Sequence, residues 1–341
     1  MSCDVSEKRY MKRFEIIEFL KGYSIFTIVV FHYLQTLDIP RPYNLAIYFG
    51  GTGVHLFVLL SGLGLYLSYL RRPVTYRTYL KKRLSKVYLP YILIVLLSAA
   101  ISLLYPIYKN SLYALGGHLF IYKMFDEDII GSYGYQLWFI SMILQFYLVF
   151  YAIVYVKERF SNVVFMAICL AVSLGWASLV FLLGKGSYRV WNSFFLQYLW
   201  EFGAGMVIAS LLHRNVSLNF KVRGIYALTI GIACCMLYAA MAVLLGRLGG
   251  LLNDIPALIG YSLLGIWIYQ LRNDTITHFF LFTGKVSFSL YLLHILILRI
   301  ATYLSTSVPL FIILPASFVL CYLLALYYQR MMNQFYQKLG I

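Results

Sequence analysis

Long apolar segments separated by short polar stretches make up almost the whole chain. The pattern predicts ten such segments, at 15–37, 44–70, 87–108, 136–156, 162–184, 190–212, 224–246, 251–271, 281–303 and 308–329. A helix of about 20 mainly apolar residues crosses the hydrocarbon core of a bilayer. We therefore expect an all-α fold, a polytopic transmembrane helix bundle of about ten spans. The segments 190–212 and 251–271 are the least certain spans because each carries polar residues.

The composition excludes a soluble enzyme with a single membrane anchor. The chain is 62% hydrophobic and only 12% charged, and a soluble domain would carry about twice that charge. Its 32 tyrosines and 25 phenylalanines suit a membrane protein, because tyrosine favours the membrane–water interface. No flexible linker, repeat or low-complexity tract is visible, so we expect one integral-membrane domain over residues 1–341.

The distribution of Lys and Arg predicts the orientation of the bundle. With a cytoplasmic N-terminus, the inner segments carry 20 of the 28 Lys and Arg residues, and the outer loops carry 6. These six are Arg41, Lys109, Lys123, Lys185, Arg189 and Arg247. Cytoplasmic loops of membrane proteins are enriched in Lys and Arg, so both termini are expected in the cytoplasm. The net charge of +16 therefore reflects topology and does not indicate a nucleic-acid partner.

The first apolar segment, FEIIEFLKGYSIFTIVVFHYLQ, contains two ionisable side chains on one helix face. Lys21 and His32 are separated by close to three helical turns, roughly 16 Å along the axis. We expect Lys21 near one membrane surface and His32 near the middle of the bilayer, where an ionisable residue is a candidate functional group. The alternative is that Lys21 reaches the headgroups and His32 is an interior hydrogen-bonding residue.

The segment between the second and third spans, RRPVTYRTYLKKRLSKVYLPY, is strongly basic. Residues 71–86 hold seven positive charges and no acidic residue. Such a segment suits a multiply charged phosphate, either on a lipid headgroup or on a nucleotide. The alternative interpretation is a plain determinant of topology.

Polar side chains in three later segments are expected to line a common cavity. They are Trp138, Ser141 and Gln145 in the fourth segment, Glu201 in the sixth, and Tyr291 and His294 in the ninth. Residues three or four apart share a helix face, and a carboxylate within a span needs a partner or water. His55, at the outer end of the second segment, is either a functional residue or, as is more common at such a position, one that simply meets water. The six histidines are scattered along the chain, so no metal site is expected.

Six sequence motifs, taken together, resemble a known family. They are EFLKGYSIFTIVVFH with Glu18, Lys21, Gly22 and His32, then GVHLFVLLSGLGL, KRLSKVYLPY, LWFISMILQFYLVF, EFGAGM and SFSLYLLH. Their order and spacing, from about residue 14 to residue 330, resemble the integral-membrane acyltransferases of the acyltransferase-3 family, which includes polysaccharide O-acetyltransferases and fucose 4-O-acetylase-like proteins. Lys21 stands where the family usually has Arg, so the planar bidentate donor is replaced by a point charge.

The resemblance implies transfer of an acyl group, usually acetyl, from cytoplasmic acyl-CoA to a hydroxyl of a glycan or lipid-linked sugar of the cell envelope. It implies His32 and Lys21 as catalytic residues. The CoA phosphates would contact Lys81, Lys82, Arg83 and Lys86. Membrane lipid and the acceptor are the further partners, and the expected location is the bacterial cytoplasmic membrane. No metal is implied, and the oligomeric state stays open.

Two alternatives remain from sequence alone. The first is a polytopic transporter or flippase of a lipid-linked or small polar substrate, a class that fits many spans with intramembrane charge. The sequence shows neither an inverted repeat nor a pair of broken helices, which that class often has. The second is a non-catalytic assembly or lipid-binding subunit, in which Lys21 and His32 are structural.

Overall fold

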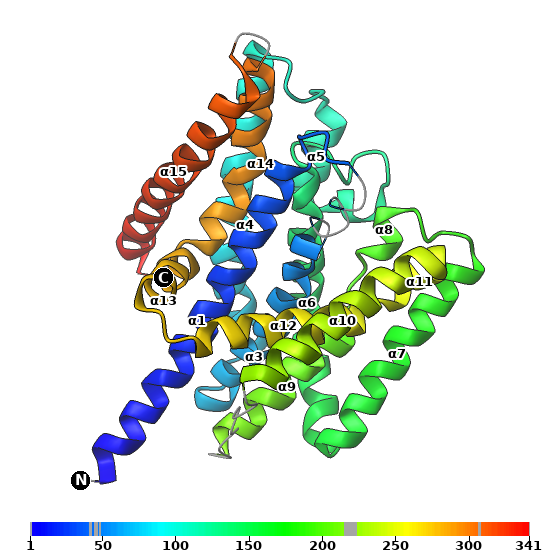
Figure 1. Ribbon diagram of the computed structural model, residues 1–341, viewed down its shortest axis with the longest axis vertical. Coiled ribbons are helices and arrows are strands. Elements are labelled where there is room, and N and C mark those ends of the chain that lie inside the picture. The colour runs from blue at the N-terminus through cyan, green and yellow to red at the C-terminus, as the bar shows by residue number, and fades with distance from the viewer. Residues whose placement is uncertain are drawn as a thin grey trace. The chain divides into compact units, whose positions relative to one another are not determined.

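The computed structural model describes residues 2–40, 43, 47, 49–214, 224–305 and 308–340, and these residues form helices and connecting segments without a strand (Figure 1). Three cations used in the predicted charge asymmetry, Arg41, Lys221 and Arg223, lie outside these residues. The expected all-α polytopic bundle is confirmed. The cytoplasmic location of both termini stays a prediction.

The chain divides into two compact units, and each unit is built from two separate chain segments. Unit 1 comprises Met1–Leu70 and Trp200–Ser287. Unit 2 comprises Arg71–Leu199 and Phe288–Ile341. Residues far apart in sequence therefore fold together within one unit, and each unit is described below by itself.

Unit 1 is built around α1 and the helices that pack on it. Its elements are α1 (Ser2–Leu34), η1 (Gly50–Thr52), α3 (Gly53–Arg71), α9 (Leu199–His213), α10 (Gly224–Leu244), α11 (Gly246–Leu252), α12 (Asp254–Gln270) and α13 (Asp274–Lys285). Helix α1 packs against α13, α12 and η1, and α10 packs against α12. An aromatic layer from α1, α12 and α13 fills the interior, with Tyr23 stacked on Tyr261 and Phe19 edge-on to Phe280.

Unit 2 pairs long apolar helices with a compact extramembrane segment. Its elements are α4 (Tyr76–Leu104), α5 (Leu112–Leu119), η2 (Tyr122–Phe125), η3 (Tyr135–Leu137), α6 (Trp138–Arg159), α7 (Asn162–Leu182), α8 (Arg189–Asn192), α14 (Ser287–Leu304) and α15 (Leu310–Leu339). Helix α6 packs against α4, and α5 packs against η2. Tyr328 of α15 donates a hydrogen bond to the carbonyl of Pro90 in α4 (2.7 Å), which ties these two helices together.

Eight helices in the described residues are long and apolar enough to cross a membrane, and a ninth span results if α11 and α12 are counted as one. The expected span at 190–212 is wrong as a single helix. It consists of the short α8, a turn segment and the 15-residue α9. The polar residues Asn192, Ser193 and Gln197 lie in that region and interrupt the apolar run.

Two further boundaries differ from expectation. The expected span 281–303 begins only at Ser287, because residues up to Lys285 belong to α13, a separate amphipathic helix of 12 residues. Helices α11 and α12 are bent by 51° at Asn253. The expectation that no broken-helix pair would occur is therefore wrong.

Candidate functional site

His32 lies near the end of its helix, so its predicted place in the middle of the span is wrong. The apolar part of α1 runs from Glu15 to Leu34, and His32 occupies the last turn. The helix ends at Leu34, earlier than the apolar pattern suggests, and just beyond its end Thr36 donates its hydroxyl hydrogen to the carbonyl of Tyr33 (2.7 Å). The side chain of His32 is 9% exposed, and its Nδ1 lies 3.2 Å from Oε1 of Gln35.

Lys21 lies closer to the middle of the apolar stretch and forms an ion pair with Glu18, with 2.8 Å between Nζ and Oε2. A close contact between α1 and α13 surrounds this pair. A Cβ atom on Gly22 would lie 1.8 Å from the carbonyl oxygen of Phe280, and one on Gly284 would lie 2.2 Å from that of Glu18. Only glycine allows two helix backbones to approach so closely. The contact fixes the part of α1 that carries Lys21.

The basic segment forms the first turns of α4. Thr75 caps this helix with its hydroxyl oxygen, as expected for an N-cap residue. Lys81, Lys82 and Lys86 are exposed, whereas Arg83 is half-buried and interacts electrostatically with Tyr79 and Tyr147. The three lysines are therefore accessible to a ligand.

The predicted cavity residues of the fourth and ninth segments lie together in unit 2. Tyr291 of α14 donates its phenolic hydrogen to the carbonyl of Gln136 (2.6 Å), and its ring meets Phe139 edge-on at 5.5 Å between centroids. His294 is fully buried, and its Nδ1 lies 2.8 Å from the carbonyl oxygen of Tyr291. Helices α6 and α14 are thus neighbours, a contact that the sequence alone left open.

The remaining residues of this set contact the segment that precedes α9. Trp138 stacks on Tyr198 with 6.1 Å between ring centroids, and the guanidinium of Arg189 lies 5.0 Å from its ring. Oε1 of Gln145 accepts a hydrogen bond from the backbone N–H of Phe195 (3.1 Å). Ser141 is 2% exposed. Glu201, the sixth member of the predicted set, belongs to unit 1 instead.

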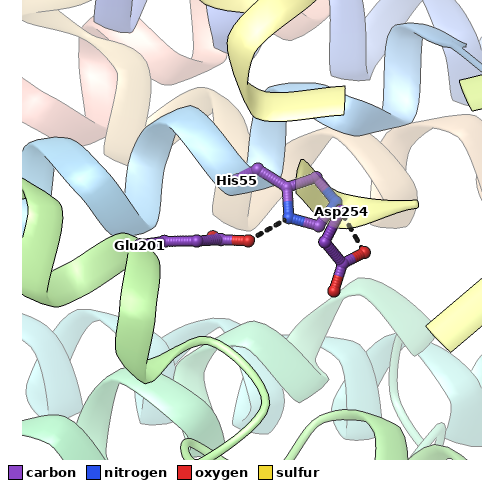
Figure 2. A group of neighbouring side chains, drawn as sticks. All are labelled: His55, Glu201 and Asp254. Carbon is purple, nitrogen blue, oxygen red and sulfur yellow. Dashed lines mark hydrogen bonds and ion pairs between the residues drawn. The ribbon is translucent and has the colours of Figure 1, made fainter. Parts of the chain in front are cut away.

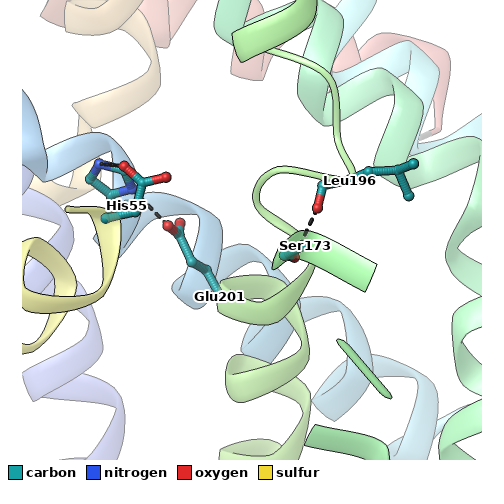
Figure 3. Close-up of polar contacts among 5 residues, drawn as sticks. His55, Ser173, Leu196 and Glu201 are labelled. Atoms are coloured by element: carbon teal, nitrogen blue, oxygen red, sulfur yellow. Dashed lines mark hydrogen bonds and ion pairs between the residues drawn. The ribbon is translucent and has the colours of Figure 1, made fainter. Parts of the chain in front are cut away.

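A hydroxyl–carbonyl contact helps hold the same irregular segment in unit 2. Ser173 of α7 donates a hydrogen bond to the carbonyl of Leu196 (2.8 Å), as Figure 3 shows. Trp176, one turn further along α7, donates its indole N–H to the carbonyl of Trp191 (3.1 Å). These bonds give the carbonyls of Leu196 and Trp191 side-chain donors, and a backbone carbonyl without a donor is costly in an apolar environment.

Glu201 lies in a cluster with His55 and Asp254, which the sequence did not predict (Figure 2). Nδ1 of His55 lies 2.7 Å from Oε1 of Glu201, and Nε2 lies 3.5 Å from Oδ1 of Asp254. The side chain of Glu201 is fully buried, and those of His55 and Asp254 are each 13% exposed. The expectation that His55 simply meets water is therefore wrong.

We call this group the His55 cluster. It bears on the expectation that the scattered histidines form no metal site. The ligand atoms of its three members lie within 4.8 Å of one another, so they are a possible set of metal ligands. The spacing of histidines alone does not reveal a site that consists of one histidine and two carboxylates from distant parts of the sequence. A usable signal existed, because each residue lies in the first turn of an apolar helix.

Close helix packing brings the cluster together. A Cβ atom on Gly62 of α3 would lie 2.1 Å from the carbonyl oxygen of Phe202, and one on Gly205 of α9 would lie 2.0 Å from that of Leu59. These two glycines let α3 and α9 touch, which places Glu201 beside His55. The break at Asn253 places Asp254 at the start of α12.

A second buried histidine lies in unit 2, in the segment between the spans that end at Leu104 and begin at Tyr135. Nδ1 of His118 lies 2.7 Å from the hydroxyl of Tyr91, and Nε2 lies 2.8 Å from that of Ser132. Burial, with the nearby charge of Lys123, lowers the pKa of His118 to about 2. Lys123 is fully buried and donates to the carbonyl of Leu137 (3.1 Å), and burial lowers its pKa to about 7. We call this group the His118 cluster.

Comparison with known proteins gives one match. A family model described as an acyltransferase domain matches residues 14–328. No curated protein and no solved structure matches the chain. The match covers most of the chain, including His32, the basic segment and the His55 cluster, and it does not support the transporter or flippase alternative.

Proposed function

Because the chain belongs to the acyltransferase-3 family and is a membrane acyltransferase, we propose that it transfers an acetyl group from cytoplasmic acetyl-CoA to a hydroxyl of a glycan or lipid-linked sugar. The observation that carries the proposal is the family match over residues 14–328. The family match supports membrane acyl transfer in general, and the proposal goes beyond it by naming an acetyl donor and a sugar acceptor.

The donor site is proposed on the basic segment. CoA carries several phosphate charges, and the exposed lysines Lys81, Lys82 and Lys86 offer cations at the start of α4. Arg83 is half-buried and interacts electrostatically with Tyr79 and Tyr147, whereas the three lysines are exposed. Charge-assisted hydrogen bonds from such groups to phosphate contribute about 1.5–3 kcal/mol each. We assign to this segment the recognition of the CoA phosphates.

The chemical step is proposed at His32. A neutral imidazole accepts the proton of an attacking hydroxyl, and a positioned base of this kind typically contributes about 10²–10⁴ in rate. An acyl-histidine intermediate is the less favoured variant. The contact between Nδ1 and Gln35 fixes the orientation of the ring. Lys21, itself held by Glu18, is assigned a role in orienting the donor and not in proton transfer.

The acceptor is proposed to contact polar and aromatic side chains of the predicted set. Within unit 2 these are Trp138, Ser141, Gln145, Tyr291 and His294, whereas Glu201, a further member of the set, belongs to unit 1. Aromatic rings beside hydrogen-bonding groups suit sugars, which present apolar faces and hydroxyl rims. The acceptor and membrane lipid would be the partners other than acyl-CoA, in a bacterial cytoplasmic membrane.

Labelling with a membrane-impermeant thiol reagent tests the orientation that this proposal requires. In a variant without the native cysteines, Arg77→Cys and Leu112→Cys each place one thiol at an exposed position. We expect labelling from outside intact cells at position 112 and protection at position 77. The reverse pattern would place the basic segment away from the cytoplasmic pool of acyl-CoA and contradict the donor site.

The reaction itself is tested with purified protein in lipid nanodiscs. Acetyl-CoA with a radiolabelled acetyl group is supplied together with an extract of lipid-linked sugars, and label in the sugar fraction is measured alongside free CoA. We expect both products to depend on the protein. Failure to release CoA and to transfer label, in a sample shown to be folded, would contradict acetyl transfer. Longer acyl-CoA donors in the same assay separate acetyl transfer from transfer of another acyl group.

A further inference from the structure

The His55 cluster places opposite charges where three helices begin. His55 is the third residue of α3, Glu201 lies in the first turn of α9, and Asp254 is the first residue of α12. The positive end of a helix dipole stabilises a carboxylate in its first turn. Two carboxylates and one imidazole are thus fixed in an interior position by backbone that converges from distant parts of the sequence.

One buried carboxylate oxygen in the cluster lacks a hydrogen-bond partner. Oε1 of Glu201 contacts His55, whereas Oε2 is buried and has no hydrogen-bond partner among the described residues. The side chain is fully buried, so an unsatisfied oxygen there is costly. A hydroxyl hydrogen from a ligand would satisfy it.

The geometry favours hydroxyl groups over a metal ion. The 2.7 Å contact between His55 Nδ1 and Glu201 Oε1 is a hydrogen bond, so these two atoms share a proton and do not both face a cation. Three helix N-termini add positive potential, which opposes a cation. Hydroxyl groups, by contrast, donate to carboxylates without adding charge.

One aromatic side chain interacts with the cluster within unit 1, and further aromatic rings pack beside it. The phenol of Tyr238, from α10, interacts electrostatically with Asp254. Phe49 lies 5.8 Å from the ring of Tyr238 and 5.7 Å from that of Tyr261, measured between centroids. Carboxylates beside aromatic rings match the alternating polar and apolar surface of a sugar.

We infer that the His55 cluster binds two adjacent hydroxyl groups of a sugar. One hydroxyl donates to Oε2 of Glu201, and its neighbour donates to Asp254, whose Oδ1 lies 3.5 Å from His55 Nε2. His55 positions both carboxylates through its two ring nitrogens. The inference rests on the proposed function in one respect, because the sugar would be the acyl acceptor, but binding itself needs no acyl-CoA.

Binding without turnover tests the inference. The full-length protein in nanodiscs is titrated with methyl glycosides of the gluco, manno and galacto series, each beside its fully O-methylated counterpart, and the thermal midpoint is followed. We expect at least one glycoside to stabilise the protein and its O-methylated form to have no effect. Glu201→Gln and Asp254→Asn should each weaken binding by about tenfold to a hundredfold, because a hydrogen bond to a charged group is lost.

Matched controls separate the cluster from general effects of charge. Asp274→Asn removes an exposed carboxylate from the first position of α13, and His278→Gln changes an exposed histidine of the same helix. Both should bind glycosides like the parent protein. Asp254→Asn serves as the second test if Glu201→Gln fails to fold, because Asp254 is partly exposed.

Three outcomes would overturn the inference. They are the absence of stabilisation by any glycoside, equal stabilisation by the O-methylated forms, and stabilisation by Zn²⁺ or Mg²⁺ that requires the same three side chains. CoA release from acetyl-CoA is measured in parallel. Loss of glycoside binding with intact CoA release contradicts only the sugar site, whereas glycoside binding without CoA release contradicts the proposed function.

Discussion

The two buried histidine clusters use the same side chain in opposite electrostatic settings. In unit 1, His55 lies between two carboxylates. In unit 2, His118 lies between two neutral hydroxyls and close to the positive charge of Lys123. The second environment keeps the imidazole neutral, and its hydrogen bonds are satisfied on both ring nitrogens. Such a closed arrangement indicates a structural role, because every donor and acceptor of the ring is used within the unit.

The His55 cluster differs because it keeps an unsatisfied carboxylate oxygen in its interior. A buried polar network that is only partly satisfied costs stability, and strain or cost of this kind is typical of binding sites. The comparison therefore separates a cluster that stabilises the fold from one that is suited to a ligand. Four measurements test this separation.

The largest effect is expected from a pair of histidine variants. His32→Gln removes the proposed base and should lower turnover by about 10²–10⁴ while the affinity for acyl-CoA changes little. His118→Gln should leave turnover per folded molecule near the parental value and lower the free energy of unfolding by about 1–3 kcal/mol, because buried hydrogen bonds are disturbed. Kinetics and thermal unfolding of both purified variants provide the measurement. Parental turnover in folded His32→Gln would make His32 structural.

The next effect concerns the charge balance of the His55 cluster. Glu201→Ala leaves His55 and Asp254 in an interior position without their buried partner, and breaking such an ion pair costs about 3–5 kcal/mol. Glu201→Gln retains an acceptor for His55 and should cost less, about 1–3 kcal/mol. Thermal unfolding in one detergent compares the two variants. Equal stability of both with the parent would show that the contact between His55 and Glu201 contributes nothing to folding.

A smaller effect is expected in the basic segment, which belongs to unit 2 like the His118 cluster but is proposed to bind a ligand. Arg83→Ala should raise the KM for acyl-CoA by about tenfold to a hundredfold and change the KM for the acceptor much less. Arg159→Ala, at an exposed position at the end of α6 and outside the basic segment, is the matched control. An unchanged KM for acyl-CoA at moderate salt would assign Arg83 to topology and packing.

A further effect, which is spread over several pH units, is a pH dependence of the His118 cluster. The pKa of Lys123 is near 7 in the folded protein and near 10.4 in an unfolded chain, so the unfolded state binds the extra proton throughout that interval. Stability should therefore rise with pH between about 7 and 10.4, by at most about 1.4 kcal/mol per pH unit. Hydrogen exchange of residues 112–135 measures it, and Lys123→Met should abolish the dependence. A flat profile in the parent protein would show that the pKa of Lys123 in the folded protein is close to its value in the unfolded chain.

The sequence predicted the fold class well because long apolar runs have few alternatives in a membrane. It misplaced boundaries where two helices share one apolar run. Residues 278–286 read HFFLFTGKV and contain no proline, so the sequence does not mark the end of α13 at Lys285. Packing decides it, because Gly284 must touch the backbone of Glu18 in α1.

The candidate site was only partly predictable for a similar reason. Lys21 and His32 are readable because helical periodicity connects them locally. His55 and Glu201 are 146 residues apart, and no local pattern connects them. Their meeting depends on Gly62 and Gly205, which in the sequence resemble ordinary small residues of apolar helices.

The discontinuous construction of unit 1 has a consequence for biosynthesis. His55 is translated 146 residues before Glu201, a delay of roughly 7–30 s at about 5–20 residues per second. During that interval the nascent α3 carries a polar imidazole in an apolar helix without its carboxylate partner. Unit 1 is complete only when Ser287 has been added. The helices of its later segment must therefore pack against α3, which was synthesised much earlier. A premature stop before residue 200 would thus leave α3 without α9 and His55 without its carboxylate partners.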